Sequence, residues 1–344
     1  MATMREVARA AGVSLATVSY VVNEGPRPVS PERRGRVLAA IAELAYEPGV
    51  RGRRRRRAPL IGALVPDATN AFFSSVLDAA QKVLQEHGHL LLVASSGDSP
   101  ARELEELAAL RRAGIDGLLL TPAGDLPPAV EAAAAGGFPV VLMDRDGGSS
   151  RLPRVVMANY RDAFRAVRVL AESGHRRIAL VNGPESVSTA RDRLHGYTDA
   201  LAHRGLAVWP EYVRSGPFTR EHGRQAAAAL MSLARPPEAI FSSSAILTVG
   251  VVQGLREQRL RWPDDVALIG YGDPPWAALL QPPLTVIDQP SAEVGRMAAR
   301  LLLSAGGPGE PRRLLLDSSL VLRESHWWVE RAAAGEHPEG VGVP

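Results

Sequence analysis

Residues Thr3 to Asn23 read TMREVARAAGVSLATVSYVVN, and this stretch decides the fold of the first part of the chain. The hydroxyl of Thr3 can cap a helix that begins at about Met4, because Glu6 follows three positions later and completes a capping box. Apolar residues then recur at helical spacing, and Gly12 permits a chain reversal that a residue with a Cβ resists. Ser14 caps a second helix. The pattern predicts two short helices around a tight turn.

The second helix is expected to have an inward and an outward face. Its valines, Val18, Val21 and Val22, face inward and pack on the first helix. The outward residues would enter the major groove of DNA if the pair is a helix-turn-helix, and they are Leu15, Ala16, Ser19 and Tyr20. An ordinary helical hairpin uses the same small residues and glycine turn, so the pattern alone leaves both interpretations open.

The charge distribution favours nucleic-acid binding. Residues 1–57 contain 12 arginines and 5 acidic residues, a net charge of +7, whereas the whole chain carries only +3. Residues 58–344 are therefore mildly acidic. A basic segment on an acidic body is typical of a module that contacts phosphates while the rest of the protein stays away from them.

Two sets of sequence motifs are spread along nearly the whole chain. The motifs in the first part are Glu6-Val7-Ala8, Gly12-Val13-Ser14, Thr17-Val18-Ser19, Asn23, Val29-Ser30 and a third helix read as Arg33 to Tyr46. Further along they are Leu60-Ile61-Gly62, Val65-Pro66-Asp67, Asn70, Phe72-Phe73, the stretch Gly174 to Leu180, Arg193, Gly196-Tyr197, Pro263 to Val266 and Pro283 to Val286. In these motifs the chain resembles the LacI family of bacterial transcription regulators.

The body of the chain alternates short β-rich runs with helix-length segments. The expected strands are 60–65, 90–95, 117–121, 140–144, 177–183, 239–243 and 266–271, and the expected helices are 72–87, 102–112, 160–173, 189–204, 221–233 and 246–258. This alternation predicts parallel sheets with helices on both faces, and ligands then bind beyond the carboxyl ends of the strands.

The expected fold class is a small all-α helix-turn-helix head followed by an α/β core of two doubly wound parallel-sheet lobes. The resemblance implies the type I topology of periplasmic binding proteins, with crossings between lobes near Ala158, Gln289 and Ser318. The expected divisions are a head at 1–48, an Arg-rich linker at 49–59, a core at 60–330 and a tail at 331–344 that we expect to be disordered. Lobe 1 takes about 60–158 and 290–317, and lobe 2 about 159–289 and 318–330.

The resemblance also indicates which residues contact DNA. Leu15, Ala16 and Tyr20 read base edges, and Tyr20 stands where many family members carry arginine, so an unusual half-site is expected. Phosphate contacts are expected mainly from polar and basic side chains, and the complete set of DNA-binding residues is Thr3, Ser14, Leu15, Ala16, Thr17, Ser19, Tyr20, Asn23, Arg27, Arg53, Arg54, Arg55, Arg56 and Arg57.

The linker departs from the family pattern. Relatives usually fold this segment into a hinge helix that wedges a leucine into the minor groove, but here Arg53 to Arg57 occupy the space, and Gly49 and Gly52 disfavour a helix. The arginines can enter a narrow minor groove or neutralise phosphates. A solvated linker that only strengthens nonspecific binding explains the same composition, and both interpretations stay open.

The effector site departs as well. By resemblance Arg193 grips the ligand, yet Ser244-Ala245 replaces a common Asn-Asp pair, and Gly272 replaces an aspartate, with Asp273 one place late. We therefore expect a ligand less polar than a common sugar, or control by a protein partner. The expected ligand residues are Asn70, Phe72, Phe73, Asp144, Arg193, Ser244, Tyr271, Asp273 and Trp276.

Other classes of protein fit the sequence less well. The chain has no cysteine, no HExxH, no GxSxG and no phosphate-binding glycine loop, so we expect neither an enzyme nor a metal or cofactor. No export signal or long apolar run occurs, so a cytoplasmic protein without membrane contact is expected. The prediction is a repressor that binds operator DNA as a homodimer under control of a small-molecule effector. A two-lobed binding protein without DNA function is the alternative.

Overall fold

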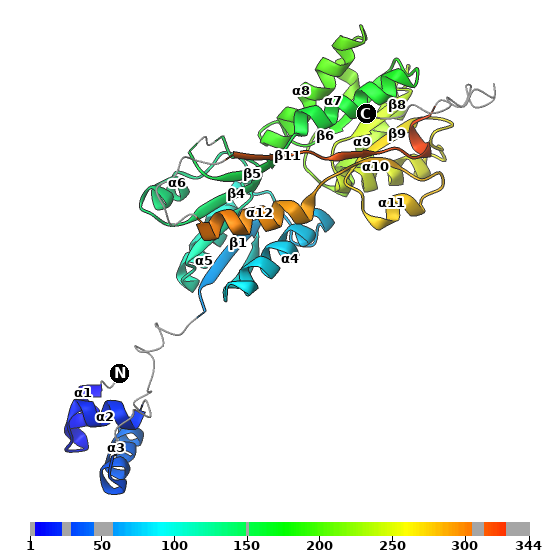
Figure 1. Cartoon of the computed structure of the whole chain (residues 1–344). Helices are drawn as coiled ribbons and strands as arrows, with labels where there is room; N and C mark the ends of the chain where they lie inside the picture. Colours follow the sequence, from blue (N-terminus) through cyan, green and yellow to red (C-terminus); the bar gives the residue numbers. More distant parts are fainter. Residues whose placement is uncertain (1–3, 23–28, 45–57, 149–150, 305–312, 328–344) are drawn as a thin grey trace. The chain divides into compact units, whose positions relative to one another are not determined.

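The structure of the chain is a computed structural model that describes residues 4–22, 29–44, 58–148, 151–304 and 313–327. Its residues group into two units, Met1–Ala58 and Pro59–Pro344 (Figure 1). The first unit is the head, and the second is the core. The boundary between the two units, between Ala58 and Pro59, coincides with the change from a basic to a mildly acidic sequence near residue 57.

The head consists of α1 (Met4–Ala10), α2 (Leu15–Val22) and α3 (Pro31–Glu43). The turn between α1 and α2 contains Gly12 at φ +63°, a conformation that favours glycine. The three helices share a small core in which Val7, Val18 and Val37 have no exposed surface. The third helix begins at Pro31, earlier than predicted, because Ser30 caps it through the amide of Arg33 and Pro31 suits a first helical position. It also ends at Glu43 rather than Tyr46.

Lobe 1 is built on a six-stranded sheet in the order β11-β5-β4-β3-β1-β2, in which each pair of neighbouring strands is parallel. Its strands are β1 (Leu60–Val65), β2 (Leu90–Ser95), β3 (Gly117–Leu120), β4 (Val140–Asp144), β5 (Arg154–Met157) and β11 (Arg313–Leu316). Its helices are α4 (Ala71–Glu86), α5 (Pro100–Ala113), α6 (Pro128–Ala135) and α12 (Ser291–Ser304). Here "lobe 1" means these strands and helices.

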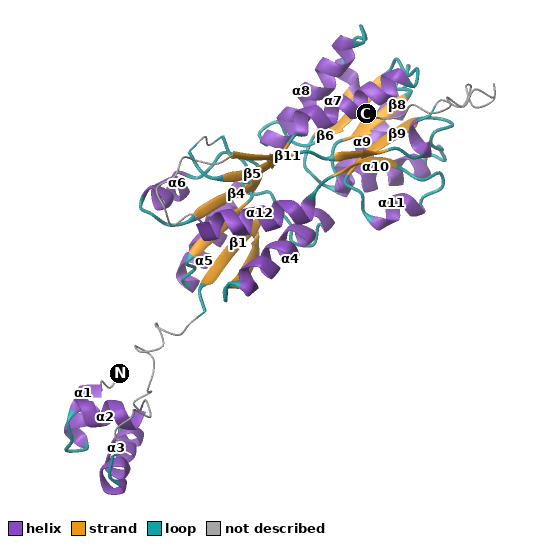
Figure 2. Cartoon of the chain, in the orientation of Figure 1, coloured by secondary structure: helices purple, strands orange, loops and turns teal. Residues whose placement is uncertain are grey.

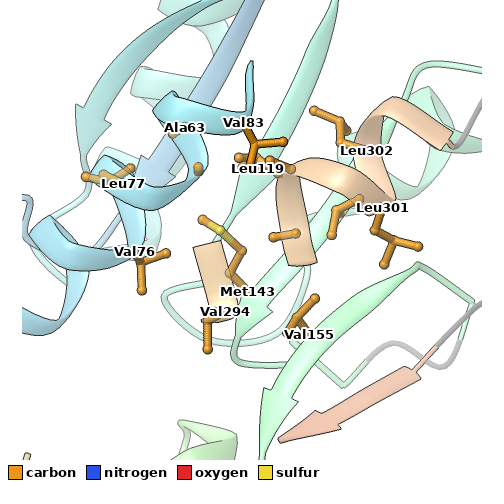
Figure 3. Close-up of a cluster of buried hydrophobic side chains, with 14 of the residues drawn as sticks. Ala63, Val76, Leu77, Val83, Leu119, Met143, Val155, Val294, Leu301 and Leu302 are labelled. Atoms are coloured by element: carbon orange, nitrogen blue, oxygen red, sulfur yellow. The ribbon is translucent and has the colours of Figure 1, made fainter. Parts of the chain in front are cut away.

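Each face of the first sheet is covered by helices. Helices α4 and α12 pack on one face, where Val76, Val294 and Leu302 meet Leu119 and Met143 of the strands (Figure 3). Helices α5 and α6 supply Leu107, Leu110 and Val130 to a separate apolar cluster with β3 and β4. A sheet buried on both faces explains why its central strands are continuous apolar runs.

Lobe 2 is built on a second six-stranded sheet in the order β12-β10-β9-β8-β6-β7, in which only the pairing of β12 with β10 is antiparallel. Its strands are β6 (Ile178–Asn182), β7 (Val213–Ser215), β8 (Ala239–Ser242), β9 (Ala267–Tyr271), β10 (Thr285–Asp288) and β12 (Ser319–Val321). Its helices are α7 (Asn159–Glu172), α8 (Ser188–His203), α9 (Arg220–Met231), α10 (Ala245–Glu257), α11 (Pro275–Leu279) and the short turns η2 (Pro210–Tyr212) and η3 (Glu324–His326). "Lobe 2" means these elements.

Helices flank the second sheet in the same way (Figure 2). Helices α7 and α8 share an apolar cluster with one face, and α9, α10 and α11 share another cluster with the same strands. The predicted fold class, an all-α head followed by two doubly wound lobes, is confirmed.

The chain passes from one sheet to the other at three places. It leaves lobe 1 between β5 and α7, returns between β10 and α12, and leaves again between β11 and β12. The last passage is short and is held by Ser318, whose hydroxyl donates to Asp162 at 2.7 Å and whose carbonyl accepts from Arg165 at 3.1 Å. Three adjacent passages tie the carboxyl ends of the two sheets to a common region.

Candidate functional site

The outward surface of α2 is the candidate DNA-reading surface. Ser14 accepts the amide of Thr17 at 3.1 Å and therefore caps the helix as predicted. Leu15 is 43% exposed and Ala16 is also exposed, while Thr17, Ser19 and Tyr20 are half-buried. On the opposite side Val18 and Val21 are buried in the core of the head. The first turn of α2 thus presents apolar side chains to solvent.

Helices α1 and α3 of the head also carry exposed basic side chains. The exposed arginines are Arg5, Arg9, Arg33, Arg34 and Arg36. Of the predicted DNA-binding residues, Thr3, Asn23, Arg27, Arg53, Arg54, Arg55, Arg56 and Arg57 lie outside the described residues, so their contacts stay predictions.

In lobe 2, Arg193 of α8 lies at the centre of a buried polar network. Its Nε and Nη2 donate to Asn159 Oδ1 at 3.0 and 2.7 Å, and its Nη1 donates to the carbonyl of Ser243. The guanidinium also stacks on the ring of Tyr271, 3.8 Å from the centroid. Asn159 Oδ1 accepts a third bond from the Tyr271 hydroxyl at 3.1 Å. Three of the five N–H donors of Arg193 are therefore used within the protein.

Gly196 brings α8 close to α7. A Cβ on Gly196 would lie 2.2 Å from the carbonyl oxygen of Tyr160, so only glycine fits this crossing. The next residue, Tyr197, is fully buried and donates to the carbonyl of Ile178 at 2.8 Å. The pair Gly196-Tyr197 thus fixes the position from which Arg193 reaches Asn159.

In lobe 1, Asp144 and Arg145 end strand β4. Asp144 has φ +63°, which is unusual for a residue other than glycine and is typical of strained functional positions. Burial raises the pKa of the Asp144 carboxyl, against the opposing attraction of Arg145 and Arg193. Arg145 is 4% exposed and pairs with Asp98, and its Nη1 also donates to the carbonyl of Pro122 at 3.0 Å.

Contacts between Asp144-Arg145 and lobe 2 show that the two sheets face each other here. The guanidinium of Arg145 lies over the ring of Phe218, 5.6 Å from its centroid. The outer edge of the Phe218 ring packs against Gly183, where a Cβ would lie 2.0 Å from Cζ of the ring. The residues of both lobes thus meet beyond the carboxyl ends of β4 and β6.

The other predicted ligand residues have varied surroundings. Asn70 caps α4 by accepting the amide of Phe72 at 3.0 Å, and Phe72 packs edge-on against the buried Phe73 at 5.1 Å. Ser244 caps α10 through the amide of Leu247 at 3.3 Å. Trp276 is half-buried on the apolar cluster of lobe 2. Their roles toward a ligand stay predictions.

Asp273 has a partner of its own. Its two carboxylate oxygens accept a bidentate pair of bonds from Arg323 at 2.9 and 2.7 Å. Arg323 also donates to the carbonyl of Leu284 at 2.8 Å. A ligand that used Asp273 would have to compete with this charge-assisted pair.

Sequence reasoning missed Arg145, Phe218 and Asn159. Arg145 follows a predicted strand directly, and that position was the available signal, because parallel strands carry functional residues at their carboxyl ends. Phe218 lies in the loop after the unpredicted strand β7, and Asn159 is the first residue of α7, so neither stood out in the sequence.

Two other kinds of site are absent from the described residues. No group of three or more His, Cys, Asp or Glu residues in the described part of the chain could hold a metal ion. Within the same residues no helix has both the length and the apolar character that crossing a membrane requires.

The arrangement defines a helix-turn-helix head joined to a two-lobed ligand-binding core. Residues 3–49 match the family described as "Bacterial regulatory proteins, lacI family", and residues 58–321 match "Periplasmic binding proteins and sugar binding domain of LacI family". The chain belongs to the LacI family and is a DNA-binding transcriptional regulator.

Individual relatives cover almost the whole chain. The ribose operon repressor of Haemophilus influenzae is 35% identical over 94% of this chain and 98% of its own length. The transcriptional repressor CytR of Escherichia coli is 34% identical over 94% of this chain and 96% of its own length. The solved complex of the transcriptional regulator CelR with cellobiose is 31% identical, covers 94% of this chain and 100% of its own, and has a TM-score of 0.71.

Proposed function

We propose that the chain is a repressor that binds a palindromic operator as a dimer and responds to an effector held between its lobes. The observation that carries the proposal is the exposed first turn of α2, where Leu15 and Ala16 stand opposite the buried Val18 and Val21. A recognition helix has this division, with its N-terminal residues free to reach base edges. The relatives from Haemophilus influenzae and Escherichia coli are named as repressors, which supports repression rather than activation.

Apolar surface on the core supports the proposed dimer. Strand β2 lies at the edge of the first sheet, and Leu90, Leu92 and Val93 on it are 55%, 36% and 40% exposed. Leu279 of α11 in lobe 2 is 79% exposed. An open edge strand with exposed leucines invites aggregation unless another surface covers it. A second copy related by a two-fold axis covers both surfaces and places two heads on two half-sites.

The buried polar groups support a binding role for the core. The network around Arg193 and the pair Asp144-Arg145 hold hydrogen-bonding groups at the strand ends of both lobes, where ligands bind in open parallel sheets. We propose that this site binds an effector and catalyses no reaction. Because the proposed protein acts on chromosomal DNA, we propose that it is located in the cytoplasm.

The test is selection of operator DNA by the full chain from a random-sequence pool. We expect a palindrome with two half-sites. The Tyr20→Arg variant should shift the half-site toward guanine, because arginine can make a bidentate contact with guanine that tyrosine cannot. Leu38→Ala, at a 52% exposed position of α3 in the same head, is the matched control and should leave the selected sequence unchanged. Recovery of no enriched sequence, or of a site without two-fold symmetry, would contradict the proposal.

A further inference from the structure

Several buried polar atoms at the carboxyl edge of the first sheet have no hydrogen-bond partner in the described structure. They are Ser96 Oγ after β2, Thr121 Oγ1 after β3, Asp144 Oδ1 at the end of β4 and Arg145 Nε. Buried polar groups are nearly always paired, and an orphaned one costs free energy. Their gathering at one sheet edge indicates that a bound molecule supplies the missing partners.

The chemistry of these atoms limits what that molecule can offer. Asp144 Oδ1 accepts a hydrogen bond, Arg145 Nε donates one, and the hydroxyl of Thr121 does both. Arg145 Nε lies 3.8 Å from Asp144 Oδ2, so a single ligand hydroxyl or amide can reach both residues. A neutral group that donates and accepts fits this edge.

An anionic group does not fit the same edge. Three carboxyl groups, those of Asp98, Glu103 and Asp144, interact with the one guanidinium of Arg145. Glu103 is itself 1% exposed and accepts the amide of Ala123 at 2.6 Å. Arg193 of lobe 2 adds a second positive charge near Asp144. A phosphate or carboxylate would therefore meet more negative than positive groups.

Apart from the two N–H donors of Arg193 that its protein partners leave unused, the facing part of lobe 2 offers little that would bind hydroxyl groups. Asp273 is held by Arg323, the Ser244 hydroxyl caps α10, and Gly272 has no side chain. What lobe 2 does present toward Arg145 is the half-buried ring of Phe218. A ligand is thus offered hydrogen bonds by lobe 1 and, from lobe 2, the part of the half-buried Phe218 ring that Arg145 and Gly183 leave uncovered.

We propose that the effector is a neutral molecule with two unlike sides: a hydroxyl or amide edge bound by Asp144, Arg145 and Thr121, and an apolar or aromatic body against Phe218. This inference rests on the proposed function, because it describes the ligand of the proposed regulatory site. It predicts discrimination against sugar phosphates and sugar acids, and against free sugars whose hydroxyls point to both sides.

Titration calorimetry on the full chain without DNA tests this with matched probes. For glucose, galactose and ribose, the free sugar, its phenyl glycoside and its phosphate are compared. We expect a phenyl glycoside to bind about tenfold or more tightly than its parent sugar, because burial of a phenyl ring contributes at least that factor, and no binding by the phosphates. Phe218→Leu should reduce the preference for the phenyl compound, and Asp144→Asn should remove binding.

Phe164→Leu is the matched control, since Phe164 is a partly buried aromatic residue of lobe 2 that stacks on Tyr160 on α7. Tighter binding of a free sugar or phosphate than of its phenyl glycoside, or no binding by any phenyl glycoside, would overturn the inference. DNA selection is measured separately, so a failed ligand result with a recovered palindrome refutes the ligand class and leaves the regulator. Loss of both results would refute the proposed function as well.

Discussion

Replacing Asp144 by asparagine should make the ligand-free core more stable while it removes effector binding. The carboxyl of Asp144 is buried, and burial penalises its charged form, which raises its pKa. Asparagine keeps the size of the side chain, carries no charge and tolerates the φ of +63° better than most residues. We therefore expect Asp144→Asn to raise the free energy of unfolding at neutral pH, by about 1.4 kcal/mol for each unit by which the folded pKa of Asp144 exceeds its unfolded pKa.

The pH dependence of stability gives the sign of this effect. Burial raises the pKa of Asp144 in the folded protein, so the folded state binds a proton more tightly than the unfolded chain does. The protonated Asp144 carboxyl therefore adds to the free energy of unfolding. This addition is fully present below about pH 3.9, the pKa of an aspartate in the unfolded chain, and it is lost as the pH rises through the raised pKa of the folded state. In that window the loss is at most about 1.4 kcal/mol per pH unit for one group. The pKa of Glu103 is also raised by burial, so part of the slope should remain in the variant.

Urea unfolding followed by far-ultraviolet circular dichroism at several pH values measures both effects. Fluorescence is a poorer reporter here, because every tryptophan follows residue 200 and those that are described lie in lobe 2 or directly after it. The control is Asp78→Asn, at an exposed carboxylate on α4 paired with Lys82. A variant Asp144→Asn that is less stable than the wild type at neutral pH, or that keeps the full pH slope, would refute this account of the site.

Three further predictions concern the head, the linker and the dimer. Gly12→Ala should destabilise the head by about 1–2 kcal/mol, because a Cβ is strained at φ +63°. A lower midpoint temperature of the head's own unfolding transition would show this. Replacement of Arg53 to Arg57 by alanine should flatten the salt dependence of DNA binding by about 0.9 in log–log slope per lost phosphate contact, and an unchanged slope argues for a linker without contacts. Leu90→Lys with Leu92→Lys should shift the chain to a monomer in sedimentation experiments, whereas Leu104→Lys on α5 should not.

The main features of the fold could be predicted where periodicity was strong. Strands such as Leu60–Val65 and Val140–Asp144 are continuous apolar runs, and the structure places them at the predicted residues. Short strands were missed, because β7 (Val213–Ser215) and β12 (Ser319–Val321) are too brief to show a period. Helix α12 was missed as well, although it completes the apolar cluster of lobe 1 with Val294 and Leu302.

The candidate site was harder to predict, because its properties depend on pairing through space. Arg193 was singled out from the sequence, but its bonds to Asn159 and Ser243 join residues far apart in the chain. The pairing of Asp273 with Arg323 is likewise invisible to local patterns, and it changes what Asp273 can offer a ligand. Sequence identifies the residue types at strand ends, while the structure shows which of their hydrogen-bonding groups are already used.

The arrangement of β11 and β12 affects how the core can be made on the ribosome. β11 (Arg313–Leu316) is an edge strand of the first sheet and β12 (Ser319–Val321) an edge strand of the second, although only two residues separate them. Helix α12 of lobe 1 is also synthesised after nearly all of lobe 2. Neither lobe can therefore complete its sheet as a nascent chain before residue 313 has been added. Both lobes can finish folding only after β11 and β12 have been synthesised, so a nonsense mutation as late as codon 310 should remove both lobes together rather than spare the first.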